Sequence, residues 1–293
     1  MKRSRSLLVL FLIALLLPCL CSCAGSDPAL ELDKAREKLA QAGSMTYEMV
    51  MDMQMTISGT PVDVETTCIA ECVADPPALK MDLSMDVYGV GIDDGGLDGL
   101  DYTVYAARGG DSFTVYTQVF GTWIKQELDG LGELKQYDLR SSMDTYLSSI
   151  SGVTRSGSED INGAPATRYD CVVSSDAVDG IIEASGVYSQ LDQLGISEEQ
   201  AREALSGLGD MSYSIWIDDG SSYPVRCEMD MSGIMGALVE KIFDTAVGEP
   251  ADASLDKMTM TMTMGGFGTI DSIEIPAEAL DAVDITGMGL PLF

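Results

Sequence analysis

The stretch Ser44–Ile57, SMTYEMVMDMQMTI, decides the fold. Methionine or tyrosine occupies every odd position from Met45 to Met55, and the residues between them are mostly polar. Successive side chains of a β-strand point to opposite faces of the sheet, so this spacing puts all the odd residues on one face. The stretch therefore predicts a strand with one apolar and one wet face, as in an antiparallel sheet.

The same alternation recurs in Met81, Leu83, Met85 and Val87, and again from Met258 to Met264, where threonines stand between the methionines. Turn sequences such as Ser58-Gly59, Phe120-Gly121, Asn162-Gly163 and Asp219-Gly220 predict hairpins between such runs. About ten or eleven strands are expected, near residues 44–57, 62–73, 79–88, 101–108, 112–119, 122–127, 153–160, 165–174, 211–218, 223–231 and 256–264.

Helical patterns flank and interrupt the strands. Asp27 and Pro28 predict the start of a helix that ends before Gly43, with Leu30, Ala35, Leu39 and Ala42 on one face. Further helices are expected near 141–150, 176–207 and 233–246, and the second breaks before Ser197-Glu198-Glu199-Gln200, which has the spacing of a capping box. One antiparallel sheet with helices on one face, an α+β fold, accommodates this order of elements.

Composition excludes several classes of function. The 293 residues include 47 acidic and 17 basic side chains, for a net charge of −30, which disfavours binding to nucleic acid. Histidine is absent, which excludes histidine-based nucleophile activation and histidine-ligated metals. The sequence has no G-x-S-x-G or S-x-x-K motif and no phosphate-binding loop, so we expect no enzyme and no cofactor.

The first residues form a targeting segment. Lys2, Arg3 and Arg5 precede the apolar run Leu7–Leu17, whose 11 residues are too few for a helix that spans a bilayer. Leu20-Cys21-Ser22-Cys23 resembles a bacterial lipobox, in which the last cysteine carries a thioether-linked diacylglycerol. The resemblance implies a signal peptide at 1–22, lipidation of Cys23, and a short tether at 23–28 before a single domain at 29–293. We therefore expect the protein at the extracytoplasmic face of the cell membrane; cleavage near Ala24 without lipidation is the alternative.

The layout of residues 29–282 resembles the LolA/LppX superfamily of half-barrels, most of all uncharacterised lipoproteins of Gram-positive bacteria. The supporting motifs are Gly121-Thr122-Trp123, Ile161-Asn162-Gly163 and Ile275-Pro276-Ala277-Glu278. The resemblance implies a strongly curved antiparallel sheet whose concave face is covered by helices. It also implies that a lipid or acyl chain binds between them, and it supplies no catalytic residue.

Methionine is the candidate ligand-binding residue, because its flexible, polarizable side chain adapts to apolar ligands of different shape. Thirteen of the 18 methionines lie in predicted strands. The candidate site comprises Met49, Met51, Met53, Met55, Met81, Met85, Met229, Met231, Met258, Met260, Met262 and Met264. These side chains could line a cavity for a lipid, in a carrier or a sensor. They could equally pack helices onto a filled interior, in a lipoprotein that has a structural role or binds a protein partner.

Four cysteines remain after Cys23, namely Cys68, Cys72, Cys171 and Cys227. An exported protein can form disulfides, so two disulfides and four buried free thiols are both open. Cys68 and Cys72 are too far apart along one strand, at about 13 Å, to bond to each other. The cysteines lack the paired C-x-x-C spacing of zinc sites, and the acidic stretch 93–101 lacks the spacing of a calcium loop, so no metal is expected.

Overall fold

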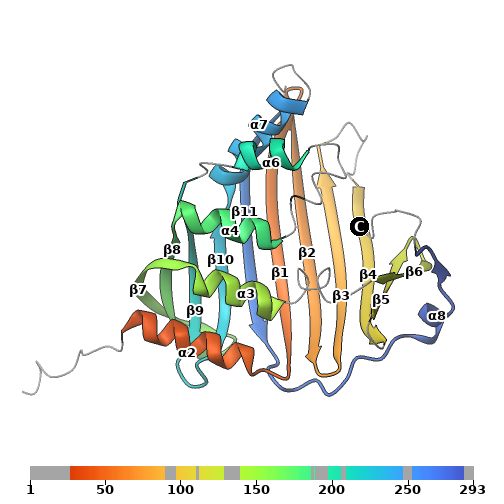
Figure 1. Ribbon diagram of the computed structural model, residues 1–293, viewed down its shortest axis with the longest axis horizontal. Helices are drawn as coiled ribbons and strands as arrows, with labels where there is room; N and C mark the ends of the chain where they lie inside the picture. Colours follow the sequence, from red (N-terminus) through yellow and green to blue (C-terminus); the bar gives the residue numbers. More distant parts are fainter. Residues whose placement is uncertain are drawn as a thin grey trace, which may run out of the picture.

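The computed structural model describes residues 27–89, 97–109, 112–128, 139–185, 188, 197–205, 209–246 and 253–286. Its main feature is a single large sheet, in which twelve strands fall within these residues (Figure 1). The strands are β1 (Ser44–Ile57), β2 (Thr60–Ala74), β3 (Pro77–Tyr88), β4 (Leu97–Gly109), β5 (Ser112–Val119), β6 (Thr122–Leu128), β7 (Ile150–Ile161), β8 (Ala164–Val173), β9 (Met211–Asp218), β10 (Pro224–Asp230), β11 (Ala253–Gly265) and β12 (Val283–Asp284).

The sheet order is β12-β6-β5-β4-β3-β2-β1-β11-β10-β9-β8-β7. Strands β1 to β6 form one meander and β7 to β11 another, with helices between some of their strands. The two halves join where β1 pairs with β11, and all pairs are antiparallel except that of β12 with β6. The short β12 follows the expected strands and was not predicted, because two residues carry no periodic pattern.

Hairpin turns lie where the turn sequences predicted them. Ser58 and Gly59 have φ of 51° and 74°, and Asn162 and Gly163 have 53° and 82°. Two consecutive residues of positive φ match the right-handed twist of the flanking strands, which is why Gly and Asn are favoured there. Phe120 and Gly121 adopt the same conformation, although an aromatic residue does not favour it.

The described helices are α2 (Pro28–Ala40), α3 (Leu139–Ser148), α4 (Ser175–Ser185), α6 (Glu198–Leu205), α7 (Ser232–Ala246) and α8 (Ala277–Leu280). In Figure 1, α2, α3, α4 and α6 all lie in front of the sheet. Asp27 caps α2 by accepting a hydrogen bond from the backbone N–H of Ala29, at 3.1 Å, and Ser197 and Gln200 form the predicted capping box of α6. Among the described helices, none is long and apolar enough to cross a membrane.

Two expectations about the fold are corrected. The sheet is open and is not strongly curled, so the expected half-barrel curvature is wrong, whereas the antiparallel sheet with helices on one face is confirmed. On α2, Leu30 was expected on the buried face but is 63% exposed, and Leu32 is buried instead, together with Ala35 and Leu39. Leu32 lies three residues before Ala35 and seven before Leu39, which is the spacing of one helical stripe, whereas Leu30 lies five and nine residues before them and points to another side of the helix.

Candidate functional site

One face of the sheet, which we call the inner face, is the side shared by Met45 and Tyr47 and covered by the helices. Strand register places eleven of the twelve predicted methionines there, and Met231, which follows the end of β10, is partly buried and packs against the same core. In the β1 and β11 pair, Met49 lies opposite Met262, Met51 opposite Met260, and Met53 opposite Met258. Met229 of β10 continues the second of these rows beyond Met260. Side chains directly opposite on neighbouring strands touch, so these methionines form a continuous surface.

The methionines differ in how well they are covered. Met81, Met229, Met262 and Met264 are between 1% and 7% exposed and belong to the main hydrophobic core. The other eight are only partly buried: Met49, Met51, Met53, Met55, Met85, Met231, Met258 and Met260. Most of the partly buried methionines lie toward the β1–β2 turn. We call these eight residues the open methionine band.

The opposite end of the inner face is filled by helices. Leu32, Ala35 and Leu39 of α2, Met143 and Leu147 of α3, and Val178 and Ile181 of α4 are buried in one cluster with the sheet. This packing explains why Met45, Met262 and Met264 are covered, whereas the open methionine band stays partly exposed even though α7 packs against β11.

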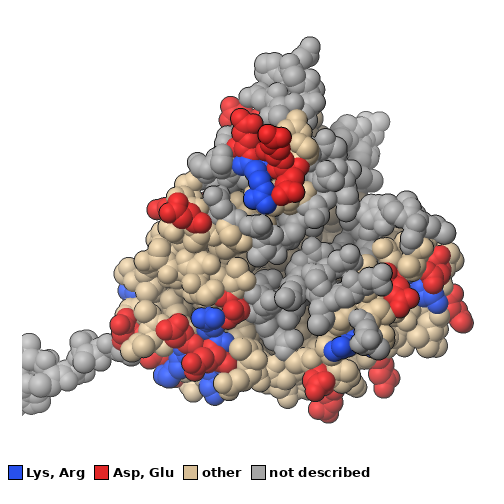
Figure 2. Space-filling model, in the orientation of Figure 1, with Lys and Arg blue, Asp and Glu red and all other residues tan. Residues whose placement is uncertain are grey.

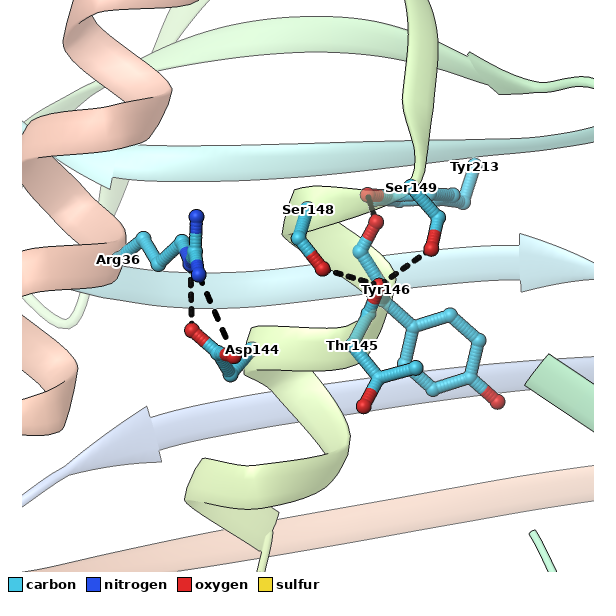
Figure 3. Close-up of polar contacts among 7 residues, drawn as sticks. All are labelled: Arg36, Asp144, Thr145, Tyr146, Ser148, Ser149 and Tyr213. Carbon is cyan, nitrogen blue, oxygen red and sulfur yellow. Dashed lines mark hydrogen bonds and ion pairs between the residues drawn. The ribbon is translucent and has the colours of Figure 1, made fainter. Parts of the chain in front are cut away.

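Polar contacts hold α3 in place over the sheet (Figure 3). The Arg36 guanidinium of α2 donates to the Asp144 carboxylate of α3 through two nitrogens. On the sheet side, the Tyr213 hydroxyl of β9 donates to the backbone oxygen of Tyr146 at 3.3 Å, and the two rings meet edge to face. Helix α3 is therefore tied both to α2 and to the sheet.

The four cysteines are free thiols and all are buried on the inner face. Desolvation, together with the nearby Asp82 carboxylate, raises the pKa of the Cys68 thiol to about 11. Burial likewise raises the pKa of both Cys171 and Cys227 to about 12. The thiols therefore stay protonated near neutral pH and behave as small apolar side chains.

Two tyrosines share this face and were missed as members of the candidate site. Burial raises the pKa of both Tyr47 and Tyr213. The Tyr47 hydroxyl lies 3.8 Å from the Met81 sulfur. Tyr47 has the same odd numbering as the methionines of β1, so its parity was the signal that placed it on this face.

The outer face of the sheet is polar. A hollow of about 400 Å³ over β8 to β11 is lined by residues that include Arg168, Asp170, Ser214 and Glu228. Arg168 donates to Asp170 at 2.9 Å, and the Ser214 hydroxyl donates to the same carboxylate at 2.8 Å. These groups bond to one another, so the hollow presents no unpaired set of ligands.

Charged side chains gather at several places on the helix-covered side. In Figure 2, acidic and basic side chains gather over α2 at the lower left and over α6 at the top. Along β1, β2, β3, β5, β6 and β11, every strand residue that shares the face of Met45 is uncharged. Within the part of the chain that is described, no three His, Cys, Asp or Glu side chains are placed to hold a metal ion.

Several predicted features lie outside the described residues. These are the targeting segment with Cys23, the tether up to Ser26, and Asp93 and Asp94 of the acidic stretch.

The structure confirms one large, largely antiparallel sheet with an apolar face covered by helices, and solved lipoproteins of the LolA/LppX class are similar to it in fold. The lipoprotein LppX of Mycobacterium tuberculosis matches with a TM-score of 0.47 and 16% identity, over 85% of this chain and 100% of LppX. LprF of Mycobacterium bovis matches with a TM-score of 0.44 and 12% identity, over 85% of this chain and 96% of LprF.

A putative outer membrane lipoprotein-sorting domain of Vibrio parahaemolyticus matches with a TM-score of 0.26 and 9% identity, over 84% of this chain and 93% of that domain. No protein-family model and no curated protein matches the chain. What this chain binds therefore has to be argued from its own residues.

Proposed function

We propose that this protein is an extracytoplasmic lipoprotein, anchored by diacylglycerol on Cys23, that binds a lipid or other apolar ligand against its inner face. It acts as a carrier or a sensor and is not an enzyme. The observation that carries the proposal is the open methionine band. Its eight methionines lie on or beside the face that forms the core elsewhere, yet they stay partly exposed.

A ligand would complete the burial of this band. Each square ångström of apolar surface removed from water stabilises a complex by about 25 cal/mol, and an acyl chain supplies such surface without a hydrogen-bonding requirement. Methionine side chains can adapt to chains of different length and branching. The inner-face residues of β1, β2, β3, β5, β6 and β11 are uncharged, which fits an apolar ligand, because a buried charge without a partner is strongly disfavoured.

The primary test is native mass spectrometry of the soluble part of the mature chain, residues 24–293, made in bacteria and purified without detergent. All described elements lie within this chain. We expect adducts with the mass of lipids, and their masses will identify the ligand class. A bare protein, even after incubation with phospholipid and glycolipid extracts, would contradict the proposal and favour a protein-interaction lipoprotein with a filled interior.

A pair of variants locates the binding surface. Met51 and Met260 are direct neighbours on the inner face, and Val50 and Thr261 are direct neighbours on the outer face of the same two strands. Met51→Gln with Met260→Gln adds polarity at similar length, so we expect it to lower lipid occupancy at least threefold. Val50→Gln with Thr261→Gln is the matched control and should leave occupancy unchanged. Equal occupancy in both variants would place the ligand elsewhere.

A further inference from the structure

Two buried polar groups on the inner face have no partner. The Thr117 hydroxyl of β5 and the Gln126 side-chain oxygen of β6 are shielded from solvent, and neither makes a hydrogen bond. Thr117 is fully buried. Buried polar atoms in native proteins nearly always have a hydrogen-bond partner, so two orphans on one face require an explanation.

Register places these two groups side by side. Thr117 lies opposite Ile124, and Gln126 lies opposite Val115, so Thr117 and Gln126 are diagonal neighbours on the same face of the β5 and β6 hairpin. Diagonal neighbours on a sheet are within reach of one shared small group. Thr117 also continues the row of Met81 and Val104, which puts it about 10 Å from Met81, two strand spacings away.

The chemistry of the pair defines the group that it can bind. The Gln126 oxygen only accepts hydrogen bonds, whereas the Thr117 hydroxyl can donate and accept. An alcohol hydroxyl satisfies both, because it donates to Gln126 and accepts from Thr117. A carboxylate or phosphate would need the N–H donors of the Gln126 amide in place of its oxygen, and the residues of β5 and β6 on this face include no cation, although Arg108 of β4 shares the face.

We propose that Thr117 and Gln126 form the polar end of the ligand site and select a neutral lipid that carries a free hydroxyl, such as a diacylglycerol or a long-chain alcohol. The proposal rests on the proposed function, since it places the apolar part of the same ligand on the inner face. Anionic phospholipids are the ligands that it disfavours.

The test compares two probes that differ only in the hydroxyl, 1-hexadecanol and 1-methoxyhexadecane. Each is titrated against the mature chain to displace a fluorescent apolar dye, N-phenyl-1-naphthylamine. Wild type is expected to bind the alcohol about three- to tenfold more tightly than the ether, the range for one net hydrogen bond. In Thr117→Val with Gln126→Leu, this ratio should fall to about one while ether binding persists.

The control makes the same two substitutions on the outer face of β5, as Thr114→Val with Gln118→Leu. It should keep the wild-type ratio. An alcohol-to-ether ratio that is the same in the inner-face variant and in wild type would overturn the inference and leave the proposed function intact. Failure of both probes to displace the dye from wild type would instead contradict the proposed function, and the inference with it.

Thermal unfolding separates ligand recognition from a structural role. Replacing an orphaned hydroxyl by a methyl group of the same shape removes a desolvation cost, so the ligand-free variant should melt at or above the wild-type temperature. The rise in melting temperature on adding 1-hexadecanol should nevertheless be smaller in the variant than in wild type. A lower melting temperature without ligand, with an unchanged shift on binding, would show that the pair only supports the fold.

Discussion

At the residue scale, the buried cysteines should make the free energy of unfolding depend on pH. Burial raises the pKa of Cys68 to about 11 and of Cys171 and Cys227 to about 12, above the value of about 8.5 for an exposed thiol. A raised pKa contributes stability that is complete below the pKa of the unfolded state and is lost as the pH rises toward the pKa of the folded state.

We therefore expect the free energy of unfolding to fall from about pH 9 upward, by at most about 1.4 kcal/mol per pH unit for each thiol. Urea unfolding between pH 7.5 and 10.5 measures this slope, and Cys227→Ala should make it shallower. A free energy of unfolding that does not change over this pH range would contradict the raised pKa of the buried thiols.

Alkylation provides a separate test of burial. At pH 8, iodoacetamide should label none of Cys68, Cys72, Cys171 and Cys227 in the folded chain and all four after unfolding.

Phe120 provides a second prediction at this scale. Its φ is 48° and its side chain is 84% exposed, so the residue has an unfavourable backbone conformation and little packing to lose. Phe120→Asn creates the Asn-Gly pair that the turn favours and should raise the free energy of unfolding by about 0.5 to 1 kcal/mol. The reciprocal variant Asn162→Phe should lower it by a similar amount in a thermal melt. Destabilisation by Phe120→Asn would mean that the ring makes a stabilising contact.

At the scale of elements, α2 is held to the sheet by a narrow apolar stripe. Leu39 is 1% exposed and packs in the main core, whereas Leu30 of the same helix is 63% exposed. Leu39→Ala should lower the free energy of unfolding by about 2 to 5 kcal/mol through lost burial and the cavity that remains. Leu30→Ala, the matched control, should change it by less than about 0.5 kcal/mol. Equal effects in urea unfolding would contradict this docking of α2.

Local signals in the sequence predicted the elements well. Alternating side chains located eleven strands, and the turn pairs at Ser58 and Asn162 located their hairpins, because both depend on neighbouring residues. The expectation for Leu30 was wrong at the level of the sequence itself, because the spacing of Leu32 from Ala35 and Leu39 already indicates the buried face of α2. Eleven of the twelve methionines were placed on one face by their parity, but their partial exposure could not be predicted, since it depends on where the helices end.

The two unpaired groups, Thr117 and Gln126, could not be predicted from the sequence for the same reason. Thr117 was in a predicted strand, yet its lack of a partner depends on its surroundings in the folded sheet. The pairing of β1 with β11 could not be predicted either, because no turn joins these strands.

At the scale of the whole molecule, the proposed lipoprotein signal and the acidic composition would act together. Removal of residues 1–22 takes away Lys2, Arg3 and Arg5 but no acidic residue, so the mature chain is even more acidic than the precursor. Anionic headgroups would repel such a surface, and attachment would depend on acyl chains at Cys23.

Cys23→Ala should therefore abolish incorporation of an alkyne-labelled fatty acid and release the protein from the membrane fraction. Cys21→Ala is the matched control and should be labelled as wild type. Label that persists in Cys23→Ala would contradict lipidation at this residue.

The pairing of β1 with β11 also affects how the chain can fold after synthesis. Thr56 and Asp256 are 200 residues apart in the chain and hydrogen-bonded across this pair. When a polypeptide crosses a membrane from its N-terminus, β1 to β6 emerge long before β11. Until β11 arrives, one edge of β1 is unpaired, and its backbone N–H and C=O groups lie exposed beside a row of methionines. Non-local pairing of this kind is slow, and a bare strand margin recruits other chains. If the chain is exported as proposed, the interval between the arrival of β1 and that of β11 is the period in which it would be most vulnerable to aggregation, and a holding chaperone would act there.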